Sequence, residues 1–262
     1  SLEVTNDADI LGATAITGAL SAASAEFSSE TGGWADPVRY ENALTAFDAA
    51  TKDFFGSGVG LSGDGLVLAV GASMWEGNST NQGGVYIYDW NSANDTWHVR
   101  QGGVITASDA GNTDRFGEST SLNSDGTILA TGAMMWDDEV SGQGAAYVFE
   151  YENNAWSQKG STVSHPNPTQ DDYHTHVSIS GNGLVLSVGV YCYDGAAGVN
   201  QGATYIYDWD ASTEDWSLRG SVLVPSDPAA SDFYGRDTSL SNDGSVLIVG
   251  SALWEGDTTN QG

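Results

Sequence analysis

The side chains best suited to chemistry in this sequence are carboxylates that stand among glycine and asparagine residues. Asp and Glu number 35 against 7 Lys and Arg. Closely spaced oxygen ligands are what Ca²⁺ prefers. Such ligands stand in three corresponding segments: Glu76 in one, Asp137 and Asp138 in another, and Glu255 and Asp257 in the last. Because these acids keep no fixed spacing, solvated loop tips are the simpler interpretation, and calcium binding is the alternative.

A second set of acids is more regular, since each stands two residues before an aromatic residue. The set consists of Asp53, Asp114, Asp171 and Asp232. Identical placement indicates a structural role, in which the side chain accepts backbone N–H bonds where the chain crosses between repeated units. We therefore expect no catalytic role for these acids.

One histidine pair departs from the repeat. His174 and His176 lie two residues apart, so a strand would place both rings on one face. With His165 or Cys192 nearby, they could bind a transition metal. The third ligand is not identified by spacing, and divergence of one repeat is the simpler interpretation. Cys192 is the single cysteine, which excludes an intrachain disulfide.

Aromatic residues are frequent, with 9 tryptophans and 11 tyrosines. One position holds an aromatic ring in every repeat: Trp75, Trp136, Tyr193 and Trp254. Rings beside carboxylates and amides are typical of sugar-binding surfaces, and large rings also fill the space between packed units. We name these four residues as glycan-contact candidates, and packing between blades is the simpler interpretation.

These residues recur because the sequence itself repeats about every 60 residues. Each copy reads as four short strands separated by turns, in the first copy roughly 57–62, 66–73, 84–90 and 96–105. The second strand is continuously apolar, as expected where both faces are buried. The turn before it ends in a glycine that a tight hairpin requires at positive φ: Gly65, Gly126, Gly183 and Gly244.

Tandem four-stranded antiparallel units of this length predict an all-β fold, the β-propeller. The pairs Phe55-Gly56 and Phe116-Gly117, each followed by Gly-Ala after an apolar strand, resemble the FG-GAP repeat of integrin-alpha-type propellers. The blocks are also similar to FG-GAP-like repeats in large surface proteins of microbes and algae. The resemblance covers residues 53–262, and residues 1–52 fit it loosely.

We expect one β-propeller domain over residues 1–262, with four to five blades visible. Either the N-terminal segment closes a small ring, or the chain is part of a larger propeller. The expected units are a degenerate or partial blade at 1–53, blades at 54–114, 115–172 and 173–232, and a partial blade at 233–262.

The formal charge of -28 predicts repulsion of nucleic acids and of anionic lipids. No apolar run is long enough to cross a membrane. Two sequons, at Asn78 and Asn94, fall in expected loops, where a secreted protein would carry N-glycans. These features favour an extracellular or cell-surface location, with other surface or filament proteins, further copies of the chain, or glycans as partners.

No P-loop, nucleophile elbow or zinc-protease motif is present. The sequence therefore predicts no enzyme, no catalytic residue, no metal and no cofactor, with calcium as the open alternative. The leading hypothesis is a structural or adhesive module of a cell-surface or filamentous assembly. A calcium-dependent or lectin-like carbohydrate-binding propeller is the second hypothesis, and a polysaccharide-active propeller enzyme is the third.

Overall fold

A computed structural model describes residues 44–138, 140–166, 168–169 and 172–254. The chain divides into two units, Ser1–Glu41 and Asn42–Gly262, and all described residues belong to the second. Their regular structure consists of strands, and these residues contain no helix that could cross a membrane. The blade expected at 1–53 lies almost entirely outside them.

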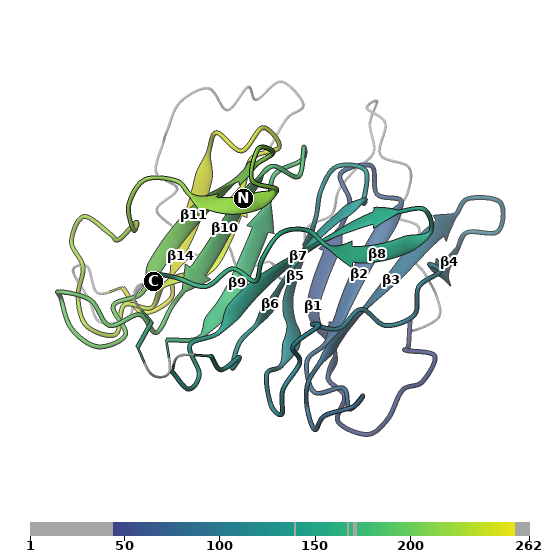
Figure 1. The fold of residues 1–262 in the computed structure, drawn as a ribbon, viewed down its shortest axis with the longest axis horizontal. Coiled ribbons are helices and arrows are strands. Elements are labelled where there is room, and N and C mark those ends of the chain that lie inside the picture. The colour runs from purple at the N-terminus through teal and green to yellow at the C-terminus, as the bar shows by residue number, and fades with distance from the viewer. Residues whose placement is uncertain (1–43, 139, 167, 170–171, 255–262) are drawn as a thin grey trace, which may run out of the picture. The chain divides into compact units, whose positions relative to one another are not determined.

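Within each sheet, the strands lie side by side in the order in which they follow one another along the chain (Figure 1). Three sheets have four antiparallel strands and one has two. We call them blades 1 to 4, and the all-β prediction of repeated four-stranded blades is confirmed. Blade 1 holds β1 (Phe55–Leu61), β2 (Val67–Ala72), β3 (Gly84–Asn91) and β4 (Thr96–Val99). Blade 2 holds β5 (Phe116–Leu122), β6 (Ile128–Ala133), β7 (Ala145–Glu152) and β8 (Ala155–Gln158). Blade 3 holds β9 (His174–Ile179), β10 (Val185–Val190), β11 (Ala203–Asp210) and β12 (Asp215–Leu218). Blade 4 holds β13 (Tyr234–Leu240) and β14 (Leu247–Ser251).

Neighbouring blades pack through their first two strands. β1 contacts β5, β5 contacts β9, and β9 contacts β13. The second strands of blades 1 to 3 are largely apolar, and every residue of β6 and β10 is buried. One core cluster joins Ile87 of blade 1 to Phe116 and Tyr147 of blade 2. The core therefore lies between blades, which is why single repeats would not bury their own apolar faces.

The turns between the first two strands meet one another. The glycine that ends each turn has a positive φ, from 67° to 75°, as a tight turn requires. The Asp64 N–H donates to the Ser124 carbonyl, the Ser124 N–H to the Gly181 carbonyl, and the Gly181 N–H to the Asn242 carbonyl. We call the first strand of each blade its inner strand. The turns that follow the inner strands are therefore linked from blade to blade.

Each inner strand starts with a β-bulge, at the end opposite to this turn. In blade 2, Phe116 pairs with Ala133 and Ser119 with Gly132, so Gly117 and Glu118 are extra residues on β5. Gly235 and Arg236 are the extra residues in blade 4. Blade 3 has a single extra residue, Thr175, between two paired histidines. The repeat pattern in the sequence placed Tyr173, two residues after Asp171, at the aromatic position of the motif. This is corrected: His174 holds that position, because the bulge of blade 3 is one residue shorter.

The fourth strand is shorter than the sequence predicts. β4 ends at Val99, whereas the sequence predicts a fourth strand over roughly 96–105. The Arg100 N–H donates to the Ile87 carbonyl, and Gly102 and Gly103 follow with positive φ, so the chain leaves the sheet. It returns at Ile105, which forms an isolated bridge with Val85.

Candidate functional site

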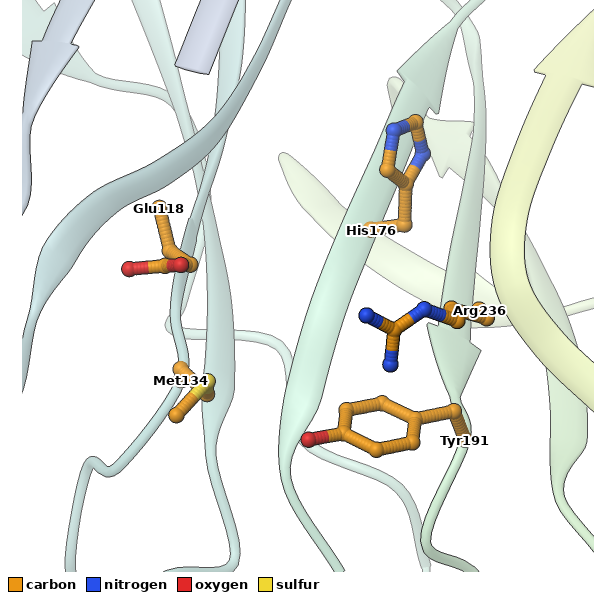
Figure 2. A pocket seen from close by; sticks show the side chains of 5 residues that line it. All are labelled: Glu118, Met134, His176, Tyr191 and Arg236. Atoms are coloured by element: carbon orange, nitrogen blue, oxygen red, sulfur yellow. The ribbon is translucent and has the colours of Figure 1, made fainter. Parts of the chain in front are cut away.

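The bulge end carries a pocket of about 230 Å³ built by three blades. Its side chains come from β5, from β9, from β13 and from the residues that directly follow β6 and β10 (Figure 2). A bulge leaves residues unpaired and re-aims their side chains, which is how Glu118 and Arg236 come to face the pocket. The lining residues are Glu118, Met134, His176, Tyr191 and Arg236.

The two sides of this pocket differ in charge. Glu118 and Met134 lie on one side, and His176, Tyr191 and Arg236 lie on the other (Figure 2). The guanidinium of Arg236 lies over the Tyr191 ring, with its carbon 5.4 Å from the ring centroid. Burial raises the pKa of Tyr191 to about 12, so its hydroxyl stays protonated and can donate. The pocket thus offers a carboxylate opposite a guanidinium and a phenol.

Hydrogen bonds fix the ring of His176. Its Nδ1 accepts the Thr238 N–H at 3.2 Å, and its Nε2 lies 3.2 Å from the Asp237 carboxylate. An accepting Nδ1 carries no proton, so the proton is on Nε2 and points to Asp237. Both ring nitrogens are therefore engaged by the protein.

The transition-metal alternative gains no support from these contacts. The His174 side chain lies outside the description, and burial raises the pKa of the Cys192 thiol to about 11, which disfavours the thiolate that a metal needs. Across the described ranges, no group of three or more His, Cys, Asp or Glu side chains is placed to hold a metal ion.

The regular acid before each bulge accepts a backbone hydrogen bond. In each blade a carboxylate oxygen accepts the N–H of the residue three positions earlier. Asp171 lies outside the described residues, and Asp172 makes this contact in blade 3, as the shorter bulge requires. Asp172 also lies 3.1 Å from His165, and both side chains are fully buried. The four acids and their donors are Asp53 with Ala50, Asp114 with Gly111, Asp172 with Thr169, and Asp232 with Ala229.

The glycan-contact candidates are packed into their blades. Trp136 is 9% exposed and belongs to a core cluster, so it offers no face to a sugar, and there the prediction is wrong. Trp75 and Tyr193 are partly buried against core clusters, and the indole N–H of Trp75 donates to Asp48 at 3.3 Å. Trp254 makes the same bond to Asp227 at 3.2 Å. For these three residues glycan contact stays a prediction.

A second and larger cavity, of about 870 Å³, lies beside the residues that directly precede β1 in blade 1. It brings Trp75 together with Asp48, Lys52, Asp53 and Glu76, so one member each of the glycan-contact candidates, the regular acids and the calcium candidates meets there.

The remaining calcium and glycosylation candidates lie in separate places. Asp137 and Asp138 are exposed in blade 2, while Glu255 and Asp257 lie outside the described residues. The two sequon asparagines, Asn78 and Asn94, are exposed. Calcium binding and glycosylation stay predictions.

A buried glutamine before each third strand was missed by sequence reasoning. The Gln82 side-chain oxygen accepts the N–H groups of Asn78 and Ser79, which orders the loop after β2. The signal was present in the sequence, because each of these residues precedes a glycine at the same repeat position. The three are Gln82, Gln143 and Gln201, with 3%, 1% and 3% exposure.

A cation at each blade boundary was also missed. Arg100 pairs with Asp89 at 2.6 Å, donates to the Gly126 carbonyl of blade 2 at 2.7 Å, and lies over Tyr151. In blade 2 the equivalent Lys159 pairs with Glu150 and lies over Trp209 of blade 3. In blade 3, Arg219 pairs with Asp208 and reaches the Gly244 carbonyl of blade 4. Three of the seven basic residues thus connect neighbouring blades.

Comparison with solved structures finds distant likenesses. Hydrazine synthase of Kuenenia stuttgartiensis is 14% identical, with a TM-score of 0.44, over 79% of this chain and 45% of that chain. The periplasmic gluconolactonase PpgL of Pseudomonas aeruginosa is 16% identical, with a TM-score of 0.48, over 76% and 51%. A putative 6-phosphogluconolactonase of Bacteroides uniformis ATCC 8492 is 10% identical, with a TM-score of 0.45, over 76% and 50%. The chain spans about half the length of each, and no curated protein matches it.

These likenesses correct one prediction. The sequence, which lacks familiar catalytic motifs, predicted no enzyme, yet two of the three similar structures are described as lactonases. At 10–16% identity the likeness concerns the fold and assigns no reaction to this chain.

The family comparison agrees with the repeat that the sequence displays. The family model described as the FG-GAP repeat matches residues 39–88 and 99–149. The first match runs through the bulge and first three strands of blade 1, and the second reaches β7. Residues 39–88 and 99–149 therefore match the FG-GAP repeat, and the described residues form propeller blades.

Proposed function

We propose that these blades form an extracellular or cell-surface binding module, which contacts a glycan or protein ligand through the bulge end. One observation carries the proposal: the repeat diverges at the positions that line the pocket. The second extra residue of the bulge is Glu118 in blade 2 and Arg236 in blade 4. The residue after the second strand is Met134 in blade 2 and Tyr191 in blade 3.

Positions that hold the blades together vary much less. The acid before the bulge accepts a backbone N–H in each blade, the turn glycine keeps a positive φ, and a buried glutamine recurs in blades 1 to 3. A scaffold that stays uniform while its pocket varies is what a binding module needs, because specificity comes from a few polar groups on a rigid frame.

The extracellular location is supported by the repeat type, since FG-GAP repeats typically occur in extracellular proteins. Exposed sequons at Asn78 and Asn94 agree with it. In this setting the module would serve a surface or filamentous assembly, with other surface proteins, further copies of the chain or glycans as partners.

A calcium-dependent or lectin-like site at the larger cavity is the second candidate. The observation that favours it is the meeting of Trp75 with Asp53 and Glu76 at one cavity. A half-buried indole beside carboxylates, in a cavity of about 870 Å³, has the size and chemistry for an oligosaccharide.

Binding of the full chain to extracellular material from its source tests the main proposal. We expect the double variant Glu118→Gln, Arg236→Gln to lose retention on this material. The matched double variant Asp138→Asn, Arg219→Gln changes the same residue classes outside the pocket and should bind as the unmodified chain does. Equal retention of both double variants, with unchanged melting, would refute the use of this pocket.

A further inference from the structure

Arg236 lines the pocket at the bulge end and, among the described residues, forms no ion pair with an acidic residue. Arg100, Lys159 and Arg219 each form an ion pair within their own blade. Among the described residues, the contact of the Arg236 guanidinium is the Tyr191 ring at 5.4 Å. Stacking covers a face of the guanidinium, and no described residue accepts a hydrogen bond from its N–H edge. A planar edge of this kind binds a carboxylate through two parallel hydrogen bonds.

The opposite side of the pocket offers the complementary groups for a sugar ring. Glu118 is partly buried and forms no ion pair with Arg236, so its oxygens can accept hydrogen bonds from hydroxyl groups. Met134 beside it supplies an apolar contact (Figure 2). A volume of about 230 Å³ is below the range of pockets that take drug-sized ligands, and suits one ring.

We infer that this pocket takes a sugar residue that carries a carboxylate, a uronic acid, with its carboxylate on Arg236 and ring hydroxyls on Glu118. The inference rests on the proposed binding function and names the ligand class of the same site. The charge of -28 does not prevent it, because carboxylates farther than about 8 Å are largely screened at physiological ionic strength. Arg236, which would contact the carboxylate directly, then decides whether the pocket prefers a charged or a neutral sugar.

Calorimetric titration of the full chain with two methyl glycosides tests the inference. One ligand is the methyl glycoside of galacturonic acid, and the other is methyl galactoside, which has a neutral hydroxymethyl group in place of the carboxylate. We expect the uronide to bind about tenfold tighter or more, as a charged hydrogen-bonded pair requires. Arg236→Gln should abolish this preference, Arg236→Lys should keep part of it, and Arg219→Gln should leave it unchanged.

Three results would overturn the inference, and they separate it from the proposed function. Equal affinity for both glycosides would mean that the carboxylate is not recognised. Binding of free glycine but of neither glycoside, dependent on Arg236, would assign the pocket to zwitterions. Binding of none of these ligands, while the Glu118 and Arg236 variants still lose retention on extracellular material, would reject the uronic acid and leave the proposed function standing.

Discussion

The carbonyl oxygen of Gly117 occupies the space where a side chain on Gly71 would begin. Gly71 lies in β2 of blade 1, and Gly117 is the bulge glycine of blade 2. The same overlap relates Gly189 of blade 3 to Gly235 of blade 4. Blades therefore pack backbone against backbone at this point, which accounts for both glycines of the Phe-Gly and Gly-Ala motifs.

Gly71→Ala should destabilise the protein by about 1–3 kcal/mol, since an added methyl group forces neighbouring backbone to move. Gly250 is the matched control, because it holds the equivalent position in blade 4 and an added Cβ would have its nearest neighbour at 3.6 Å. Gly250→Ala should stay within about 0.5 kcal/mol of the unmodified chain. Urea unfolding of both variants measures the difference, and equal losses would contradict the backbone contact.

Arg100→Met should lower the free energy of unfolding by about 1–3 kcal/mol, because it removes charged hydrogen bonds and a contact with the next blade. Its side chain is 11% exposed. The control is Arg219→Met, where the equivalent side chain is 45% exposed and its ion pair is worth about 1 kcal/mol or less. Thermal unfolding compares them, and a larger loss at Arg219 would argue against the role of burial.

Hydrogen bonds from Ser241 and Ser245 lower the pKa of Asp243 from an ordinary 3.8 to about 2. A lowered folded-state pKa gives a stabilisation that is present above pH 3.8 and is lost as the pH falls from 3.8 towards 2. NMR titration of the carboxyl carbon should show this low value. Double substitution of Ser241 and Ser245 by Ala should return it towards 3.8, and a normal pKa in the unmodified chain would refute the turn geometry.

Expression of the full chain in a secreting eukaryotic cell should add N-glycans at Asn78 and Asn94, since both side chains are exposed. Intact mass before and after enzymatic deglycosylation detects them. Asn78→Gln and Asn94→Gln should each remove one glycan. If a variant carries the same glycan mass as the unmodified chain, the sequon that it removes carries no glycan.

Chelation tests calcium binding at the exposed loop acids of blade 2. We expect the melting temperature in EDTA to equal that in millimolar calcium, because loop tips with exposed acids are sufficiently solvated without a metal. Asp137 already accepts the Gly142 N–H at 2.6 Å. A higher melting temperature in calcium, lost in Asp137→Asn, would support a cation site in blade 2.

The repetition of the sequence made the strands predictable. The contacts between repeats were not predictable from it. Val67, Ile128 and Val185 recur as buried starts of continuous apolar strands, so sequence alone indicates β2, β6 and β10. The pocket combines Glu118, Tyr191 and other residues from three repeats, and no local pattern places them together. Asp171 was chosen over Asp172 because motif alignment counts residues, whereas strand pairing decides which residue begins β9.

The bulge at the start of each inner strand makes the length of the strand adjustable. Deleting a residue within a regular strand turns every later side chain to the opposite face. Blade 3 has one residue fewer than blades 2 and 4, yet Val177 is 1% exposed, as buried as Thr120 and Thr238 at the matching positions. The bulge absorbs the deletion before the paired region begins. Insertions and deletions there can reshape the binding end during evolution while the core of each blade keeps its order.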